Sequence, residues 1–99
     1  MNRVETASGS LISEPTTFWV YNLENEAGRF YVGSSDDPER RLTEHNDTSS
    51  GHVTFTHKHG PWELVWQESH PTRAAAMARE RQIKRMKSAH WIRANLLKR

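Results

Sequence analysis

Residues 17–46 read TFWVYNLENEAGRFYVGSSDDPERRLTEHN, and this stretch decides the fold. Residues 17–23 and 29–34 are rich in aromatic and β-branched side chains, which favour strands. The residues between them, ENEAG, have the composition of a turn and end in a glycine, which tolerates a positive φ. Two strands joined by a short turn that contains glycine predict an antiparallel hairpin.

Three segments of helical composition and one further strand follow the hairpin. Asp37, Thr72 and Ser88 are suited to cap the helices, because their side-chain oxygens accept hydrogen bonds from free backbone amides. The expected elements are a helix at about 38–45, a polar loop at 47–60, a strand at 62–68, and helices at about 73–87 and 89–97. The order of elements is therefore β-β-α-β-α-α.

The expected third strand, residues 62–68, carries large apolar side chains at alternate positions. Trp62, Leu64 and Trp66 fall two residues apart. Because side chains of a strand alternate between its faces, this spacing predicts that the three lie on one buried face of the sheet.

Length and composition limit the architecture and the kinds of site. The chain has 99 residues, which suits one domain with a modest core. It has no cysteine, so disulfides, thiolate zinc sites and thiol nucleophiles are excluded. We expect a flexible tail at residues 1–15 and a single domain at 16–99. No apolar run suits a membrane span and no secretory signal is evident, so we expect a cytoplasmic protein without a membrane partner.

The charge is unevenly distributed along the chain. Residues 1–50 carry four basic and nine acidic side chains, whereas residues 51–99 carry ten basic and three acidic ones. A basic half on a small domain is typical of proteins that bind polyanions, and a solvated basic helix face is the alternative. Glu80 is the only acid among the last 21 residues.

Glu80 falls on or beside the apolar stripe of its helix, next to Ala76 and Ile83. A carboxylate in such a place needs a cation, because glutamate is almost never fully buried unless it is paired. Two partners remain open from the residues alone. One is a basic side chain in a structural ion pair, and the other is Mg²⁺, which prefers hard oxygen ligands.

Four other side chains could take part in chemistry. Arg41 and His45 are four residues apart and share a helix face, where arginine suits phosphate and histidine suits proton transfer. Tyr21 and Tyr31 lie one in each hairpin strand, and core aromatic packing is the alternative for them. Loop histidines 52, 57 and 59 lack a fourth zinc ligand, so a polar loop that faces nucleic acid is favoured over a metal site.

The ordered set of motifs resembles the GIY-YIG nuclease family, in particular the small stand-alone members often labelled URI-type endonucleases. The resemblance covers about residues 17–92. Its motifs, in chain order, are Trp19-Val20-Tyr21, Tyr31-Val32-Gly33, Asp37-Pro38-Glu39-Arg40-Arg41-Leu42, His45-Asn46, Gly60-Pro61-Trp62-Glu63-Leu64-Val65, Pro71-Thr72-Arg73, Ala76-Met77, Glu80 and Lys84.

This resemblance implies an α+β fold with a small three-stranded antiparallel sheet flanked by helices. It also implies an endonuclease that hydrolyses DNA phosphodiester bonds with Mg²⁺ or Mn²⁺, with DNA repair among its settings. The residues leave RNA open as an alternative to DNA. By resemblance, Tyr21 is a general base or water activator, Tyr31 orients water and phosphate, Arg41 clamps the phosphate, His45 lies near the nucleophile, and Glu80 holds the metal.

Three positions differ from the pattern of many relatives. Ser34 replaces a lysine, Ile92 replaces an asparagine, and Trp19 replaces the first glycine of the first motif. Two alternatives therefore accompany the nuclease hypothesis: a catalytically weak or inactive nucleic-acid-binding module, and an interaction domain that presents Trp62, Trp66 and Trp91. The residues expected to contact nucleic acid are Ser34, Arg40, His57, Lys58, Arg73, Lys84 and Lys87.

Overall fold

The structure, a computed structural model, describes residues 16–47 and 59–99. Its centre is a three-stranded sheet in the order β3-β2-β4, built from β2 (Phe18–Asn25), β3 (Phe30–Ser35) and β4 (Trp62–His70). Both pairs of strands are antiparallel. The predicted hairpin is therefore confirmed, and β3 forms one edge of the sheet.

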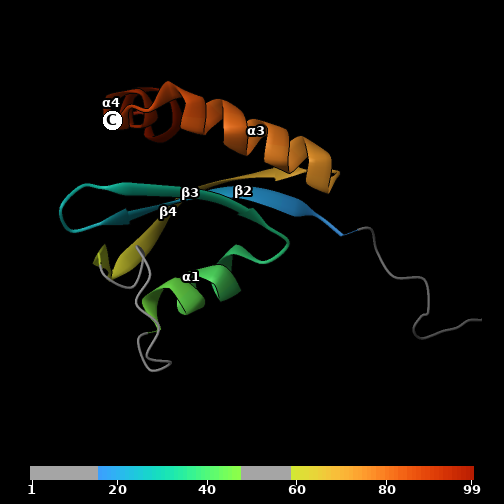
Figure 1. The fold of residues 1–99 in the computed structure, drawn as a ribbon, viewed down its shortest axis with the longest axis horizontal. Helices are drawn as coiled ribbons and strands as arrows, with labels where there is room; N and C mark the ends of the chain where they lie inside the picture. The colour runs from blue at the N-terminus through green and yellow to red at the C-terminus, as the bar shows by residue number, and fades with distance from the viewer. Residues whose placement is uncertain (1–15, 48–58) are drawn as a thin grey trace, which may run out of the picture.

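Helices cover both faces of the sheet, as Figure 1 shows. α1 (Pro38–Asn46) lies on one face, and α3 (Arg73–Met86) lies on the other, with α4 (Ala89–Ile92) beyond its end. The predicted α+β fold with its flanking helices is confirmed. The last predicted helix is wrong in one respect, because the chain changes after Ile92 into a π-helical turn, η1 (Arg93–Leu97).

The three predicted caps hold the helix starts. The side chain of Asp37 accepts a hydrogen bond from the Arg40 amide. Thr72 and Ser88 do the same for the amides of Ala75 and Trp91. These bonds satisfy backbone donors that have no partner inside the helix, so the start of each helix is fixed by a local signal.

Each face of the sheet has its own apolar core. The cluster under α1 consists of Tyr21, Leu23 and Trp62, with Tyr31, Leu42 and Leu64 packed against it. The cluster under α3, α4 and η1 consists of Val20, Val32, Ala76, Ile83, Ile92 and Leu96, with Phe18, Phe30, Trp66, Trp91 and Leu97 packed against it. In the parts of the chain that the structure describes, no helix is both long and apolar enough to cross a bilayer.

An irregularity in β4 changes which face its tryptophans occupy. Asn22 pairs with Trp66 and the next residue of β2, Leu23, pairs with Leu64, so Val65 is an extra residue. An extra residue in one strand reverses the alternation of faces beyond it. The prediction that Trp62, Leu64 and Trp66 share a face is therefore wrong: Trp66 packs under α3, and the other two pack under α1.

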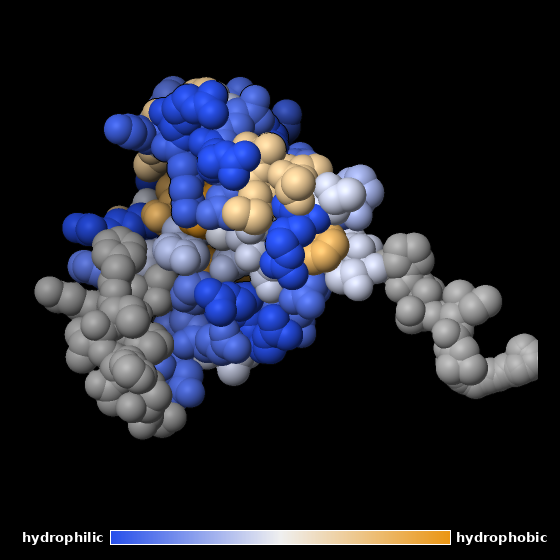
Figure 2. Space-filling model, turned by 45° about the vertical axis from the view of Figure 1, so that its right-hand side comes forward, coloured by the Kyte–Doolittle hydropathy of each residue, from blue (hydrophilic) through white to orange (hydrophobic). Residues whose placement is uncertain are grey.

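The interaction hypothesis based on exposed tryptophans is also corrected. Trp62 is only 4% exposed, and Trp66 and Trp91 pack against the core under α3. The large apolar side chains that are exposed, among the described residues, are Met77 and Met86. Figure 2 agrees, because the visible surface is mostly hydrophilic with small apolar patches.

Asn22 is a polar side chain in an apolar place, and it supports a stability prediction. It is fully buried in the central strand, and neither of its amide atoms has a hydrogen-bond partner among the described residues. We expect Asn22→Leu to raise the free energy of unfolding by about 1–3 kcal/mol, because leucine is similar in size and removes the desolvation cost of the amide. Urea denaturation measures the change.

Asn25 provides the matched control at the end of the same strand. Its side chain donates to the His59 carbonyl and accepts from the Arg29 amide. Asn25→Leu removes both bonds and should therefore lower stability. A loss of stability in Asn22→Leu equal to that in Asn25→Leu would show that the buried amide is satisfied.

Candidate active site

The register of the hairpin brings the two tyrosines together. Tyr21 pairs with Gly33, and Leu23 pairs with Tyr31. Residues directly opposite each other in an antiparallel pair project to the same face, so both tyrosines lie on the face that α1 covers. Their ring centroids are 6.5 Å apart, and Tyr21 is only 1% exposed.

Gly33 makes room for the Tyr21 ring. A Cβ atom at this position would lie 2.6 Å from the Tyr21 hydroxyl oxygen and 2.7 Å from Cζ. Both distances are far below van der Waals contact, so a side chain at residue 33 and the present position of the ring exclude each other. Sequence analysis placed Gly33 in a motif but missed this role, which requires knowledge of the register.

His45 reaches the tyrosines from the last turn of α1. Its Nε2 atom lies 3.2 Å from the Tyr21 hydroxyl, and its ring centroid lies 4.6 Å from that of Tyr31. The imidazole is buried, with 7% exposure. The structure thus brings together the two tyrosines and the histidine that the sequence singled out separately.

Arg41 lies one turn before His45 on α1. The nearby Tyr21 phenol is the main reason why the pKa of Arg41 is raised. Arg41 also donates to Glu44 through Nη1, at 2.8 Å. The adjacent Arg40 pairs with Asp36 and, like Arg41, with Glu44.

The surroundings of Tyr21 keep its phenol neutral. Burial raises the pKa of Tyr21 above its ordinary value of 10.0, while the nearby Arg41 acts in the opposite direction. The negative charge of Glu80 also raises this pKa.

Glu80 lies on α3 and is anchored to the edge strand. Its Oε1 accepts a hydrogen bond from the Ser34 hydroxyl at 2.7 Å, and its Oε2 lies 2.7 Å from Lys84 Nζ. The carboxylate therefore forms an ion pair with Lys84. A basic partner of this kind was one of the two alternatives that the sequence left open. Tyr31 and Ser34 project to opposite faces of β3, so the candidate site extends around the edge of the sheet.

The donors around Glu80 fit Mg²⁺ or Mn²⁺ better than zinc. The carboxylate and the Ser34 hydroxyl are hard oxygen donors. Mg²⁺ is commonly held by one or two carboxylates together with waters and substrate phosphates. Within residues 16–47 and 59–99, no group of three or more His, Cys, Asp or Glu side chains is arranged to hold a metal ion by itself.

The residues expected to contact nucleic acid do not all lie near this site. Lys84 and Lys87 lie at the end of α3 that follows Glu80, whereas Arg73 begins the helix and stacks on Phe18. His52, His57 and Lys58, like the expected tail at 1–15, lie outside the described residues. Ile92 belongs to the core, so the position where relatives carry asparagine contributes no polar group here.

Comparison with known proteins places the chain in a family. The family model of the GIY-YIG catalytic domain matches residues 17–93. A UPF0213 protein of Aeromonas salmonicida is 36% identical over 78 residues, which cover 78% of this chain. A UPF0213 protein of Enterococcus faecalis is 35% identical over 68 residues, which cover 69% of this chain and 77% of that protein. The chain spans only 56% of the Aeromonas salmonicida protein.

Two further comparisons concern a named endonuclease and a solved structure. The structure-specific endonuclease subunit SLX1 of Vanderwaltozyma polyspora is 38% identical over 66 residues, which cover 62% of this chain and 21% of that protein. The solution NMR structure of the UPF0213 protein BH0048 from Bacillus halodurans has 32% sequence identity and a TM-score of 0.42, covering 70% of this chain and 71% of that one. The match of the family model over residues 17–93 shows that the chain belongs to the GIY-YIG family, a family of endonucleases.

Proposed function

We propose that this protein is a divalent-metal-dependent endonuclease that hydrolyses phosphodiester bonds of DNA. The observation that carries the proposal is the hydrogen bond between Tyr21 and His45, beside which Arg41 lies one turn earlier on the same helix as His45. The SLX1 relative, named as a structure-specific endonuclease subunit, supports this substrate class. A cytoplasmic location and a role in DNA repair belong to the same proposal.

Tyr21 and His45 form a path for the proton of the attacking water. A phenol with a raised pKa is a poor base by itself. It can, however, accept a proton from water while its own hydroxyl proton passes to His45 Nε2, if the imidazole carries its hydrogen on Nδ1. Histidine exchanges protons near neutral pH, so it suits the end of this path. Tyr31 packs beside both rings and orients water and phosphate.

Arg41 and Glu80 have the role of stabilising the negative charge of the phosphate, Arg41 directly and Glu80 by holding a divalent ion. The guanidinium of Arg41 offers a planar set of donors that stabilises the charge that develops on the phosphoryl oxygens. Glu80, with the Ser34 hydroxyl, would hold one divalent ion. When bound, such an ion polarises a phosphoryl oxygen and lowers the pKa of its water. Lys84 and Lys87 are proposed to contact the DNA backbone, as are Arg40 and Arg73 farther from the site.

One observation favours a binding module without catalysis as the alternative. Lys84 lies 2.7 Å from Glu80 Oε2 and neutralises the carboxylate that would hold the metal. A protein that only binds DNA would keep this ion pair in the complex. An assay on plasmid, branched DNA, single-stranded DNA and RNA, with Mg²⁺ or Mn²⁺ and with EDTA, separates the two functions. Binding to DNA without cleavage in any metal would contradict the nuclease proposal.

The two adjacent arginines of α1 test the proposed phosphate clamp. We expect Arg41→Gln to lower the cleavage rate by about 10²–10³-fold, which is the usual effect of removing one donor to a transition-state oxyanion. Arg40→Gln removes the same charge, but the wild-type Arg40 side chain is already paired with exposed acids. We therefore expect this variant to bind DNA a few-fold more weakly and to keep the wild-type turnover rate. Equal losses of turnover in the two variants would contradict the assigned role of Arg41.

A further inference from the structure

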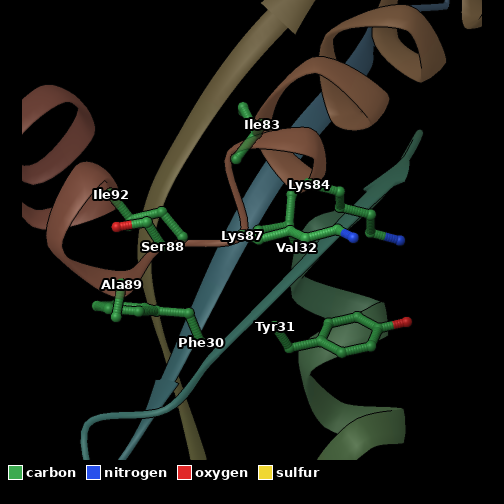
Figure 3. A pocket seen from close by; sticks show the side chains of 9 residues that line it. All are labelled: Phe30, Tyr31, Val32, Ile83, Lys84, Lys87, Ser88, Ala89 and Ile92. Atoms are coloured by element: carbon green, nitrogen blue, oxygen red, sulfur yellow. The ribbon is translucent and has the colours of Figure 1, made fainter.

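A pocket of about 350 Å³ adjoins the candidate site at the edge of β3. Its apolar wall comes from three elements and includes Phe30, Ile83 and Ile92, while Lys84 and Lys87 form its charged rim. Tyr31 lies at the edge of the pocket, with its side chain on the face of the sheet that α1 covers. Figure 3 shows the two lysine nitrogens on one side of the pocket and Phe30 and Ile92 on the other, while the Tyr31 ring extends away from the pocket in front of α1. Pockets of this size and composition are typical of small-ligand sites.

Two residues of the pocket also belong to the candidate active site. Tyr31 lines the pocket and contacts His45 through their rings. Lys84 lines the pocket and is paired with Glu80. A molecule in the pocket would therefore lie beside the ion pair of Lys84 and Glu80. The exposed Lys87 has no ion pair with any acid that the structure describes, so its charge is free to meet a phosphate.

We propose that this pocket receives an unpaired nucleotide next to the scissile phosphate, with its base against the apolar wall and its phosphate on Lys84 and Lys87. The inference rests on the proposed endonuclease function. A nucleotide uses both parts of the pocket, because it combines an apolar ring with an anion. Inorganic phosphate would make no contact with the apolar wall. An apolar peptide would bury the ammonium groups of Lys84 and Lys87 without giving them a negatively charged partner.

This occupant defines a class of substrate. A base inside a continuous duplex is stacked and paired, so it must be extruded before it can enter a pocket. The cost is least for a base that is mismatched or already single-stranded. The protein should therefore cleave DNA with an unpaired nucleotide at the cleavage point faster than continuous duplex. Base contacts of this kind contribute about tenfold or more in affinity.

Binding of small probes tests the pocket without any cleavage. Isotope-labelled protein in EDTA is titrated with deoxyadenosine 5′-phosphate, 2-deoxyribose 5-phosphate and inorganic phosphate, and backbone amide NMR shifts are followed. We expect the nucleotide to shift the amides of residues 83–92 and to bind at least about fivefold more tightly than the other two probes. Equal binding of all three, or shifts located elsewhere, would overturn the proposal.

The chain offers a matched pair of lysines for the phosphate contact. Lys87 and Lys98 both follow a helix with positive φ, at 49° and 59°, and Lys98 is outside the pocket. Glycine suits such positions, so both substitutions should preserve the fold. Lys87→Gly should weaken binding of a labelled single strand several-fold and reduce its salt slope by about 0.7, whereas Lys98→Gly should change neither. Identical effects would contradict a phosphate contact at Lys87.

A pair of alanines tests the base contact. Ala89 is exposed and lines the pocket, so Ala89→Phe fills the space for the base and keeps the charges. Ala94→Phe places the same side chain on an exposed position outside the pocket. Cleavage is compared on a duplex and on the same duplex with one unpaired nucleotide. We expect Ala89→Phe alone to remove a preference of about tenfold for the unpaired substrate.

Different results would overturn the endonuclease function and the assignment of the pocket. If the wild-type protein cleaves no substrate but Ala89→Phe still abolishes nucleotide binding at residues 83–92, the endonuclease proposal is overturned and the pocket assignment holds. If the wild type cleaves both duplexes equally, and Ala89→Phe changes neither rate, the pocket assignment is overturned and the endonuclease proposal holds.

Discussion

Glu80→Gln is expected to lower the rate of DNA cleavage by at least about a thousandfold in Mg²⁺ or Mn²⁺, because it removes the negative charge that would hold the ion. The fold should be unaffected. Glutamine keeps an oxygen that can accept the hydrogen bond from Ser34, and its other partner, Lys84, has a side chain that is 52% exposed. Single-turnover cleavage of a labelled oligonucleotide measures the effect, and thermal unfolding checks the fold.

Glu68 is the matched control for this substitution. It is also a half-buried glutamate, and it accepts hydrogen bonds from Arg79 Nε at 3.0 Å and from the neighbouring imidazole of His70. Glu68→Gln should cleave DNA at nearly the wild-type rate. Similar rates in the two variants would show that the carboxylate of Glu80 serves only the ion pair with Lys84.

Gly33→Ala is expected to have the second largest effect, on both stability and activity. The new Cβ overlaps the Tyr21 hydroxyl and Cζ, and the fully buried ring has little room to move. Overpacking of this kind costs about 1–3 kcal/mol. Because the shifted phenol leaves His45, cleavage should fall at least as far as in Tyr21→Phe, by about 10²–10⁴-fold. Urea denaturation and the cleavage rate measure the two effects.

A double-mutant cycle tests whether contact with the Tyr21 ring causes the loss of stability in Gly33→Ala. In a Tyr21→Val background the ring is absent, so Gly33→Ala should cost at least about 1 kcal/mol less than it does in the wild type. If the cost were the same in both backgrounds, the glycine would be needed for some other reason, and the close approach of the Tyr21 ring would not explain its place in the sheet.

The sequence predicted the parts of the fold that depend on local signals. The hairpin follows from two short strand-forming segments around a turn, and the helix starts follow from Asp37, Thr72 and Ser88, each of which caps amides within its own turn. The extra residue Val65 has no such signal. It is defined by the pairing of β4 with β2, which requires contacts between distant parts of the chain.

In the candidate site, too, the sequence predicted what depends on local spacing and missed what depends on contacts between distant residues. Arg41 and His45 share a helix face by spacing alone, and Tyr21 and Tyr31 share a sheet face by hairpin register. The hydrogen bond between Ser34 and Glu80 joins residues 46 positions apart, so periodicity could not reveal it. Ser34, which the sequence suggested as a contact for nucleic acid, also donates a hydrogen bond to the carboxylate on which the metal proposal depends.

The proposed active site combines side chains from both layers that flank the edge strand. His45 is supplied by the layer on one side of the sheet and Glu80 by the layer on the other, with β3 between them. A partly folded chain that has lost either layer keeps only half of these groups. Loss of the proposed nuclease activity on heating should therefore coincide with global unfolding, and we expect a molecule that has lost either layer not to cleave DNA.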